Sequence, residues 1–191
     1  MVKAIIFDCF GVLVGKSYWD IYVAAGGDAV TDHDFIESML QKANSGAISN
    51  AVFSTIMAEK LGLSMAEYRQ LIQREERPNY QLFEYIRTDL KPKYKIAMLS
   101  NVNCGVIERK IPPELRVLFD VEVLSAEAGV QKPDLRIYEL TVDKLGVEYH
   151  EAVFTDDLPK YIAPAKELGM QTILYTGFDS FKTQLKGLLS T

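Results

Sequence analysis

The chain has 191 residues, of which 48% are hydrophobic and 25% are charged, and its formal net charge at pH 7 is −5. This balance excludes disordered, collagen-like and membrane-spanning chains, and the length fits one core domain with a modest insertion. The negative charge argues against nucleic acid as a partner, and the apolar run before Asp8 is too short for a signal peptide, so we expect a soluble, cytoplasmic protein with no membrane partner.

Five short apolar runs rich in β-branched residues predict strands. They are Ala4 to Phe7, Ile96 to Leu99, Val121 to Leu124, Ala152 to Phe154 and Thr172 to Tyr175. Their near-continuous hydrophobicity is typical of strands covered on both faces, and helical patterns separate the later ones. One of these helices is expected to carry Pro133 and Asp134 in its first turn. The pattern predicts an α/β fold with a doubly wound parallel sheet flanked by helices.

The gap between the first two predicted strands is about ninety residues long, far more than one crossover helix needs. Its first part has amphipathic helical patterns, in which Ile36, Leu40 and Ala43 share one face, and Ser64 with Glu67 has the spacing of a capping box. A helical subdomain is therefore expected inside the gap. The predicted domains are a core formed by residues 1–14 and 79–191 and a helical cap formed by residues 15–78.

Polar residues mark the carboxyl ends of four of the five predicted strands. Asp8 follows the first strand, Ser100 and Asn101 the second, a loop with Lys132 the third, and Asp156 with Asp157 the fourth. In an open α/β sheet, ligands bind beyond these strand ends, so we expect the side chains to converge. Because like charges repel, the three aspartates predict a hard divalent cation bound through oxygen, and Mg²⁺ is the expected ion. With Lys132 and Ser100 added, the site suits a phosphoryl group and predicts phosphoryl transfer.

These motifs resemble the haloacid dehalogenase-like (HAD) hydrolase superfamily, and the resemblance covers nearly the whole chain. Between Phe119 and Met170 it is almost continuous and includes Ser125-Ala126-Glu127 with Gly129, Lys132-Pro133-Asp134, Phe154-Thr155-Asp156-Asp157 and Glu167-Leu168-Gly169-Met170. The inserted helices resemble the small cap of the first subclass, which closes over the site and selects the substrate. The resemblance implies a HAD-like Rossmannoid core with this cap.

The resemblance also implies an activity, the hydrolysis of a small phosphorylated metabolite. In such an enzyme Asp8 is the nucleophile that attacks phosphorus and forms an aspartyl phosphate. Ser100 and the backbone of Asn101 would bind the phosphoryl oxygens, and Lys132 would neutralise the nucleophile and the phosphoryl group. The implied partner is therefore a small-molecule phosphorylated substrate, and the protein is expected to be a monomer or a homodimer.

The implied cofactor is Mg²⁺, held by Asp8, Asp156 and Asp157 directly or through water and by the main-chain carbonyl of Phe10. Phe10 departs from the family pattern, because phosphatases of this family usually have a second aspartate there that protonates the leaving group and activates water. A phenyl ring transfers no protons, and the loss of such help costs about 10²–10⁴ in rate. The departure favours good leaving groups, as in an acyl phosphate or a sugar 1-phosphate.

Three alternative functions stay open because of Phe10. Haloacid dehalogenases of the family have an aromatic residue at this position, but they lack the paired acids Asp156 and Asp157 and bind the substrate with an early cap arginine, whereas the first arginine here is Arg69. A second alternative uses a cap lysine, with Lys42 the nearest candidate, to cleave a carbon–phosphorus bond. The third is a catalytically degenerate member that binds a phosphorylated ligand or a protein.

Substrate choice depends on cap residues, for which there is no transferable motif. Tyr18, Trp19 and Lys42 are the cap residues expected to close over the substrate. The sequence therefore predicts the reaction in more detail than it predicts the molecule on which it acts.

Overall fold

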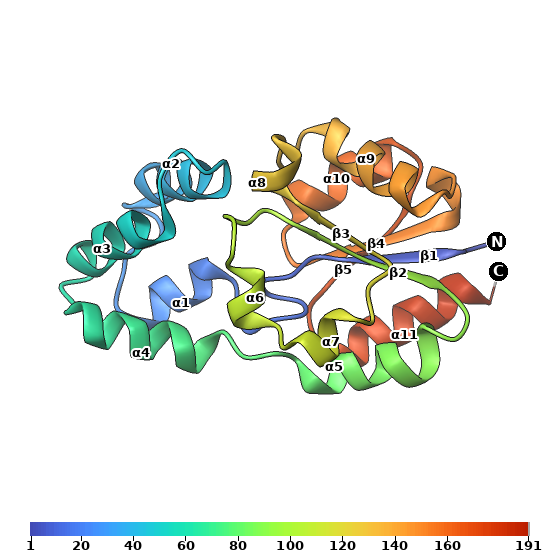
Figure 1. Cartoon of the computed structure of the whole chain (residues 1–191), viewed down its shortest axis with the longest axis horizontal. Helices are drawn as coiled ribbons and strands as arrows, with labels where there is room; N and C mark the ends of the chain where they lie inside the picture. The colour runs from blue at the N-terminus through green and yellow to red at the C-terminus, as the bar shows by residue number, and fades with distance from the viewer. Residues whose placement is uncertain (191) are drawn as a thin grey trace.

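A five-stranded parallel sheet forms the centre of the computed structural model, which describes residues 1–190 (Figure 1). The strands are β1 (Ala4–Phe7), β2 (Lys95–Ser100), β3 (Val121–Leu124), β4 (Ala152–Asp156) and β5 (Gln171–Leu174). Their order across the sheet is β3-β2-β1-β4-β5, and all neighbouring strands are parallel. The predicted α/β fold with a doubly wound parallel sheet is confirmed, and each predicted strand is present.

Helices cover both faces of this sheet (Figure 1). One face is covered by α8 (Ser125–Ala128), α9 (Leu135–Leu145) and α10 (Pro159–Glu167), and the 3-10 turn η2 (Tyr149–Glu151) leads into β4. The other face is covered by α5 (Tyr80–Tyr85) with its π-helical continuation η1 (Ile86–Leu90), α6 (Ile107–Lys110), α7 (Pro113–Arg116) and α11 (Phe178–Leu189). No helix within residues 1–190 is both long and apolar enough to cross a lipid bilayer.

The sheet separates two apolar layers because alternate side chains of each strand point to opposite faces. On β1, Ile5 and Phe7 are fully buried in the layer under α5, α6 and α11, whereas Ala4 and Ile6 are fully buried in the layer under α9 and α10. Burial on both faces explains why the strand is continuously apolar. Burial on both faces also holds β1 in place, and this fixes the position of Asp8, the residue that follows the strand.

Two predicted site residues lie at the ends of strands rather than after them. The pairing of β2 with β3 continues to Ser100, opposite Leu124, and the pairing of β4 with β5 continues to Asp156, opposite Leu174. The backbone ladder therefore extends beyond the last apolar residue and holds both polar residues rigidly. Helix α9 begins just after Asp134, which is its N-cap rather than a member of its first turn.

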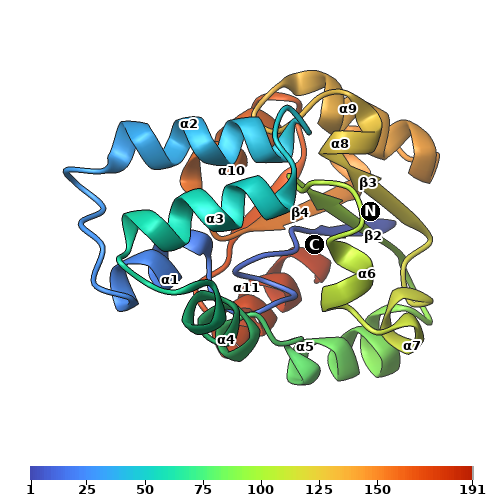
Figure 2. The ribbon, with the colours of Figure 1, turned by 60° about the vertical axis from the view of Figure 1, so that its left-hand side comes forward.

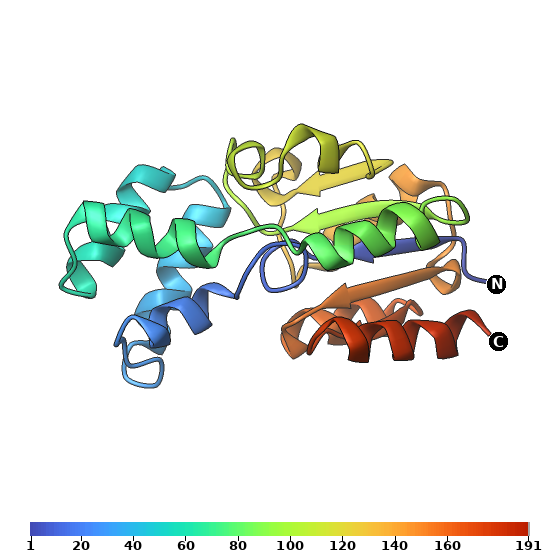
Figure 3. The same cartoon turned by 90° about the horizontal axis from the view of Figure 1, so that it is seen from below.

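Four helices form a separate unit beyond the carboxyl ends of the strands (Figures 1 and 3). They are α1 (Tyr18–Ala24), α2 (His33–Asn44), α3 (Asn50–Lys60) and α4 (Met65–Glu75). They bury an apolar cluster of their own, which includes Ile36, Met57 and Tyr68, and the capping box of Ser64 with Glu67 is formed. The separate cluster supports the proposed division into core and cap, and we call residues 15–78 the cap segment.

Two chain connections join the cap segment to the core, and they run side by side (Figure 3). The Gly15 amide donates a hydrogen bond of 2.8 Å to the Arg77 carbonyl, and Val14 forms an antiparallel bridge with Pro78. Gly15 has a φ of +47°, and a Cβ there would lie 2.0 Å from the carbonyl oxygen of Glu75. A side chain at position 15 would therefore separate the connections, which is why glycine is required.

Candidate active site

The centre of the site is the buried ammonium group of Lys132, which bridges two carboxylates. Its Nζ lies 2.6 Å from Asp8 Oδ1 and 2.6 Å from Asp156 Oδ2, and Lys132 is only 2% exposed. Asp8 follows β1 and Asp156 ends the neighbouring β4, and the Asp8 amide donates to the Thr155 carbonyl at 2.8 Å. Parallel pairing of β1 with β4 therefore brings together two aspartates that lie far apart in the sequence.

Lys132 is held in place through its main chain by the side chain of Asn101. The Lys132 amide donates to Asn101 Oδ1 and Asn101 Nδ2 donates to the Lys132 carbonyl, both at 2.8 Å. The hydroxyl of Tyr161 lies 3.3 Å from the same Nδ2, and the Tyr161 ring centroid lies 4.7 Å from Lys132 Nζ. The sequence analysis missed this positioning role of the Asn101 side chain. No local sequence pattern signals it, because the contact joins residues 31 positions apart.

Asp157 completes a cluster of three carboxylates, because one oxygen from each of Asp8, Asp156 and Asp157 lies within 4.8 Å of the others. Gly11 makes room for it. The backbone φ at Gly11 is +85°, and a Cβ at this position would lie 2.3 Å from Asp157 Oδ2. Both the backbone conformation and the space exclude a side chain at position 11. The structure therefore brings the three predicted acidic residues together.

The cluster carries more negative than positive charge. With all three acids ionised, three carboxylates face one ammonium group, which would leave a surplus of two negative charges. Burial raises the pKa of Asp8 to about 8, with Asp156 and Asp157 adding to the shift and Lys132 opposing it. Burial and then Asp156 raise the pKa of Asp157 to about 7. Because one divalent, oxygen-seeking cation would offset this surplus, the residues present fit Mg²⁺.

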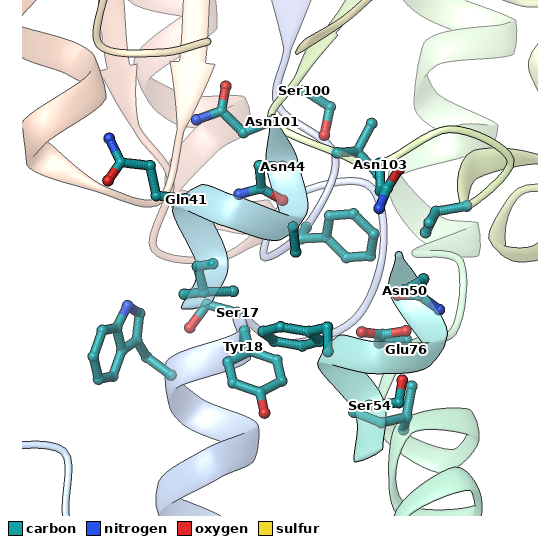
Figure 4. Close-up of a pocket in the computed structure, with 18 of the residues that line it drawn as sticks. Ser17, Tyr18, Gln41, Asn44, Asn50, Ser54, Glu76, Ser100, Asn101 and Asn103 are labelled. Carbon is teal, nitrogen blue, oxygen red and sulfur yellow. The ribbon is translucent and has the colours of Figure 1, made fainter. Parts of the chain in front are cut away.

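Ser100 has a buried hydroxyl group with nothing to bind. Its residue is 1% exposed, and Oγ has no hydrogen-bond partner within the described residues 1–190. Figure 4 shows this oxygen directed into the cavity. A buried hydroxyl without a partner is unfavourable unless a ligand supplies one. The geometry is therefore suited to donating a hydrogen bond to an oxygen atom of a bound group.

The cap helices lie beyond the strand ends of the core (Figure 2). The site lies at the base of a cavity of about 1420 Å³ between the core and the cap segment (Figure 4). Phe10 lines this cavity, two residues after Asp8, and its carbonyl as a metal ligand stays a prediction. Tyr18 and Trp19 line the cavity as expected, whereas Lys42 is not among the lining residues. The cavity is much larger than a phosphoryl group, so most of its volume is available to the remainder of a substrate.

Within residues 1–190, four polar contacts of side chains join the cap segment to the core around the cavity. They are Ser125 Oγ to the Asn44 carbonyl (2.8 Å), Asn103 Nδ2 to the Ile48 carbonyl (2.9 Å), Lys160 to Glu37 (2.6 Å) and Lys110 to Glu76. Because these contacts flank the cavity on several sides, the structure shows the cap segment closed over the core.

Several curated proteins have sequences similar to this chain over nearly its full length. Bifunctional epoxide hydrolase 2 of Sus scrofa is 25% identical over 212 residues, which cover 97% of this chain and 38% of that protein. This chain therefore spans well under half of that relative. D-ribitol-5-phosphate phosphatase of Bacteroides thetaiotaomicron is 26% identical over 207 residues, covering 100% of both chains.

Solved structures share the fold. A predicted HAD-like family hydrolase from Porphyromonas gingivalis superposes with a TM-score of 0.75 at 25% identity, covering 100% of this chain and 99% of that chain. A HAD family enzyme from Bacteroides thetaiotaomicron, crystallised with magnesium and inorganic phosphate, gives 0.66 at 22% identity, covering 91% and 93%. L-2-haloacid dehalogenase from Xanthobacter autotrophicus gives 0.64 at 19% identity, covering 98% and 83%.

The strongest assignment comes from a family model. The model of haloacid dehalogenase-like hydrolases matches residues 2–169, a span that contains the cap segment, Lys132 and all three clustered aspartates. The resemblance noted in the sequence is therefore confirmed. With the fold, the cap segment and the acidic cluster in agreement, this chain belongs to the haloacid dehalogenase-like hydrolase family.

Proposed function

We propose that this protein is a Mg²⁺-dependent phosphohydrolase that acts on a small phosphorylated metabolite through an aspartyl phosphate at Asp8. The observation that carries the proposal is the bridge from Lys132 to Asp8 and Asp156, with the unpartnered Ser100 hydroxyl beside the same cavity. A phosphoryl group spreads negative charge over its oxygens, so a site with one fixed cation and a free donor suits it.

In the first step, the formation of the aspartyl phosphate, three core residues have separate roles. The Asp8 carboxylate attacks phosphorus, and the bond from phosphorus to the leaving group breaks as the aspartyl phosphate forms. Lys132 stabilises the charge on the phosphoryl oxygens, and Ser100 donates a hydrogen bond to one of them. Because Lys132 is held through its main chain by Asn101, its charge needs no reorganisation during the reaction.

Mg²⁺ would be held by Asp8, Asp156 and Asp157, with the Phe10 carbonyl as a further ligand. When bound, it would supply positive charge to the phosphoryl oxygens and reduce repulsion between them and Asp8. The surplus negative charge of the cluster supports this assignment. The magnesium and phosphate in the crystallised HAD family enzyme from Bacteroides thetaiotaomicron agree with it.

Phe10 decides which leaving groups this site can expel. The ring lines the cavity beside Asp8 and has no proton to give, so a leaving group must depart as a stable anion. Acyl phosphates and sugar 1-phosphates meet this condition better than the phosphate esters of simple alcohols. The same lack of a base slows attack of water on the aspartyl phosphate, so we propose that the second step limits turnover.

A phosphate panel with and without Mg²⁺ tests the proposal. Acetyl phosphate, glucose 1-phosphate and ribitol 5-phosphate are offered to the wild type, to Asp8→Asn and to Asp143→Asn, whose carboxylate is exposed and outside the cavity. The expected result is Mg²⁺-dependent phosphate release by the wild type and by Asp143→Asn, with kcat/KM falling in that substrate order, and none by Asp8→Asn. Release that persists in chelator or in Asp8→Asn contradicts the proposal.

Phe10 also favours a second candidate, dehalogenation of a 2-haloacid, in which Asp8 would attack carbon instead of phosphorus. The acidic cluster of Asp8, Asp156 and Asp157 speaks against it, because a metal-free displacement of halide gains nothing from three neighbouring carboxylates. Incubation with L-2-chloropropionate in chelator distinguishes the two. Chloride release under these conditions would establish dehalogenation and replace the phosphohydrolase proposal.

A further inference from the structure

The cationic side chains on the cavity wall fall into two groups. The three lysines are all paired: Lys110 with Glu76, Lys132 with Asp8 and Asp156, and Lys160 with Glu37. The two arginines, Arg69 and Arg109, form no salt bridge within the part of the chain that the structure describes. The cavity is therefore lined by two arginines that form no salt bridge with the described residues.

The two helices that carry these arginines are joined by an ion pair beside the cavity. Arg69 is on α4, one turn before Gln73, and Arg109 is on α6. The ion pair between Glu76, at the end of α4, and Lys110, the neighbour of Arg109, joins these two helices. Figure 4 shows Glu76 on one side of the cavity and Gln41 of α2 on the other.

The α2 side of the cavity has the opposite charge. Helix α2 contributes Asp34 and Glu37 to the lining, and only Glu37 is paired with a lysine of the core. An anionic group would therefore be repelled from α2 and attracted to the side formed by α4 and α6. Guanidinium groups are also suited to this task, because their fork of donors matches the two oxygens of a carboxylate or a phosphate.

We infer that the substrate carries a second anionic group, a carboxylate or a phosphate remote from the scissile phosphoryl group, and that Arg69 and Arg109 bind it. The inference rests on the proposed function, because Lys132 and Ser100 must hold the first phosphoryl group at the base of the cavity. The volume of about 1420 Å³ leaves room for a molecule that reaches both places.

Three sugar phosphates that differ only at carbon 6 test the inference. Glucose 1-phosphate has a hydroxyl group there, glucose 1,6-bisphosphate a phosphate and glucuronic acid 1-phosphate a carboxylate. Their affinities are measured by calorimetry with Mg²⁺ in the Asp8→Asn protein, which is expected to bind without turnover. The same titrations are repeated after adding Arg69→Gln with Arg109→Gln, and after adding Arg74→Gln, which removes an arginine from α4 that pairs with Glu75 outside the cavity.

At least one of the two doubly anionic sugars is expected to bind about tenfold more tightly than glucose 1-phosphate. The double arginine change should remove most of this difference, and Arg74→Gln should preserve it. Whether the bisphosphate or the glucuronate gains more identifies the second group as phosphate or carboxylate. Equal affinities for all three sugars, or a preference that survives the double change, overturn the inference and leave the proposed function standing. If none of the sugars and no inorganic phosphate bind, the proposed function fails, and the inference fails with it.

Discussion

The two walls of the cavity are built in opposite ways. On the core side, Asp156 is fully buried, Lys132 is 2% exposed, and their charges are paired at 2.6 Å. On the cap side, Gln41, Asn50 and Arg69 line the cavity but are exposed, and half of the cap residues that line it carry neutral amides or hydroxyls. Under the proposed function, the type of reaction depends on a few buried groups, whereas substrate choice depends on exposed groups that folding does not constrain.

Phe10 offers the sharpest test of this comparison, because it belongs to the core yet controls which substrates react. Phe10→Asp supplies the missing proton carrier, and hydrolysis of ribitol 5-phosphate, an alcohol ester, should rise by about 10²–10⁴. Hydrolysis of acetyl phosphate should rise far less at the first step, because its leaving group needs no proton. The ratio kcat/KM, which reports the first step even when the second limits turnover, measures the effect on both substrates.

The control is Phe10→Leu, which removes the ring without adding a proton carrier and should produce no gain. If Phe10→Asp and Phe10→Leu behave alike, the proton account of this position is wrong.

Lys132→Met removes the buried ammonium group from the core side of the cavity. Without the ammonium group, Asp8 and Asp156 stay buried and uncompensated, so we expect a loss of about 3–5 kcal/mol in the free energy of unfolding. Activity should fall by about 10²–10³ because a fixed charge near the phosphoryl group is lost. Denaturant titration and phosphate-release assays measure the two effects.

The matched variant is Lys160→Met, in which the lost lysine is exposed and pairs with Glu37 across the edge of the cavity. Its cost should stay below about 1 kcal/mol. Equal destabilisation by the two variants would show that burial does not distinguish the walls.

Gly11→Ala tests whether backbone shape holds Asp157 in place. A Cβ at this position would lie 2.3 Å from Asp157 Oδ2, so the carboxylate must move, and Mg²⁺ affinity should fall by about tenfold. The control is Gly46→Ala. Gly46 has a φ of +77°, similar to that of Gly11, but a Cβ there would have no atom within 4 Å. The variant carries the same backbone strain, and its Mg²⁺ affinity should equal that of the wild type in calorimetric titrations.

Asp157→Asn gives the smallest effect and depends on pH. Since the folded protein holds the pKa of Asp157 at about 7, above the ordinary 3.8, the folded state binds this proton more tightly than the unfolded state does. Stability of the metal-free protein should therefore decline as the pH rises from about 4 through 7. In chelator at pH 8, Asp157→Asn should melt a few degrees above the wild type, whereas Asp143→Asn should not. A lower melting temperature for Asp157→Asn would contradict the charge surplus.

The same division between the walls explains what could be predicted from the sequence. Strands such as Ala4–Phe7 are apolar on both faces and end abruptly at polar residues, so the sheet and the aspartates at its edge could both be identified. The side-chain clamp of Asn101 on Lys132 joins residues 31 positions apart through loop geometry, which no local pattern encodes. Arg69 and Arg109 occupy ordinary exposed helical positions in the cap and in the core, and only the closed arrangement of the two brings both to the same cavity.

The most direct test of the central claim is to detect the aspartyl phosphate itself. Wild-type protein is mixed with acetyl phosphate and Mg²⁺, quenched in acid at successive times, digested and analysed by mass spectrometry. Because the first step needs no proton donor and the second lacks a base, the phosphoryl group should accumulate on Asp8 and be absent in Asp8→Asn. Release of phosphate while the peptide containing Asp8 stays unmodified at every time point would contradict the account.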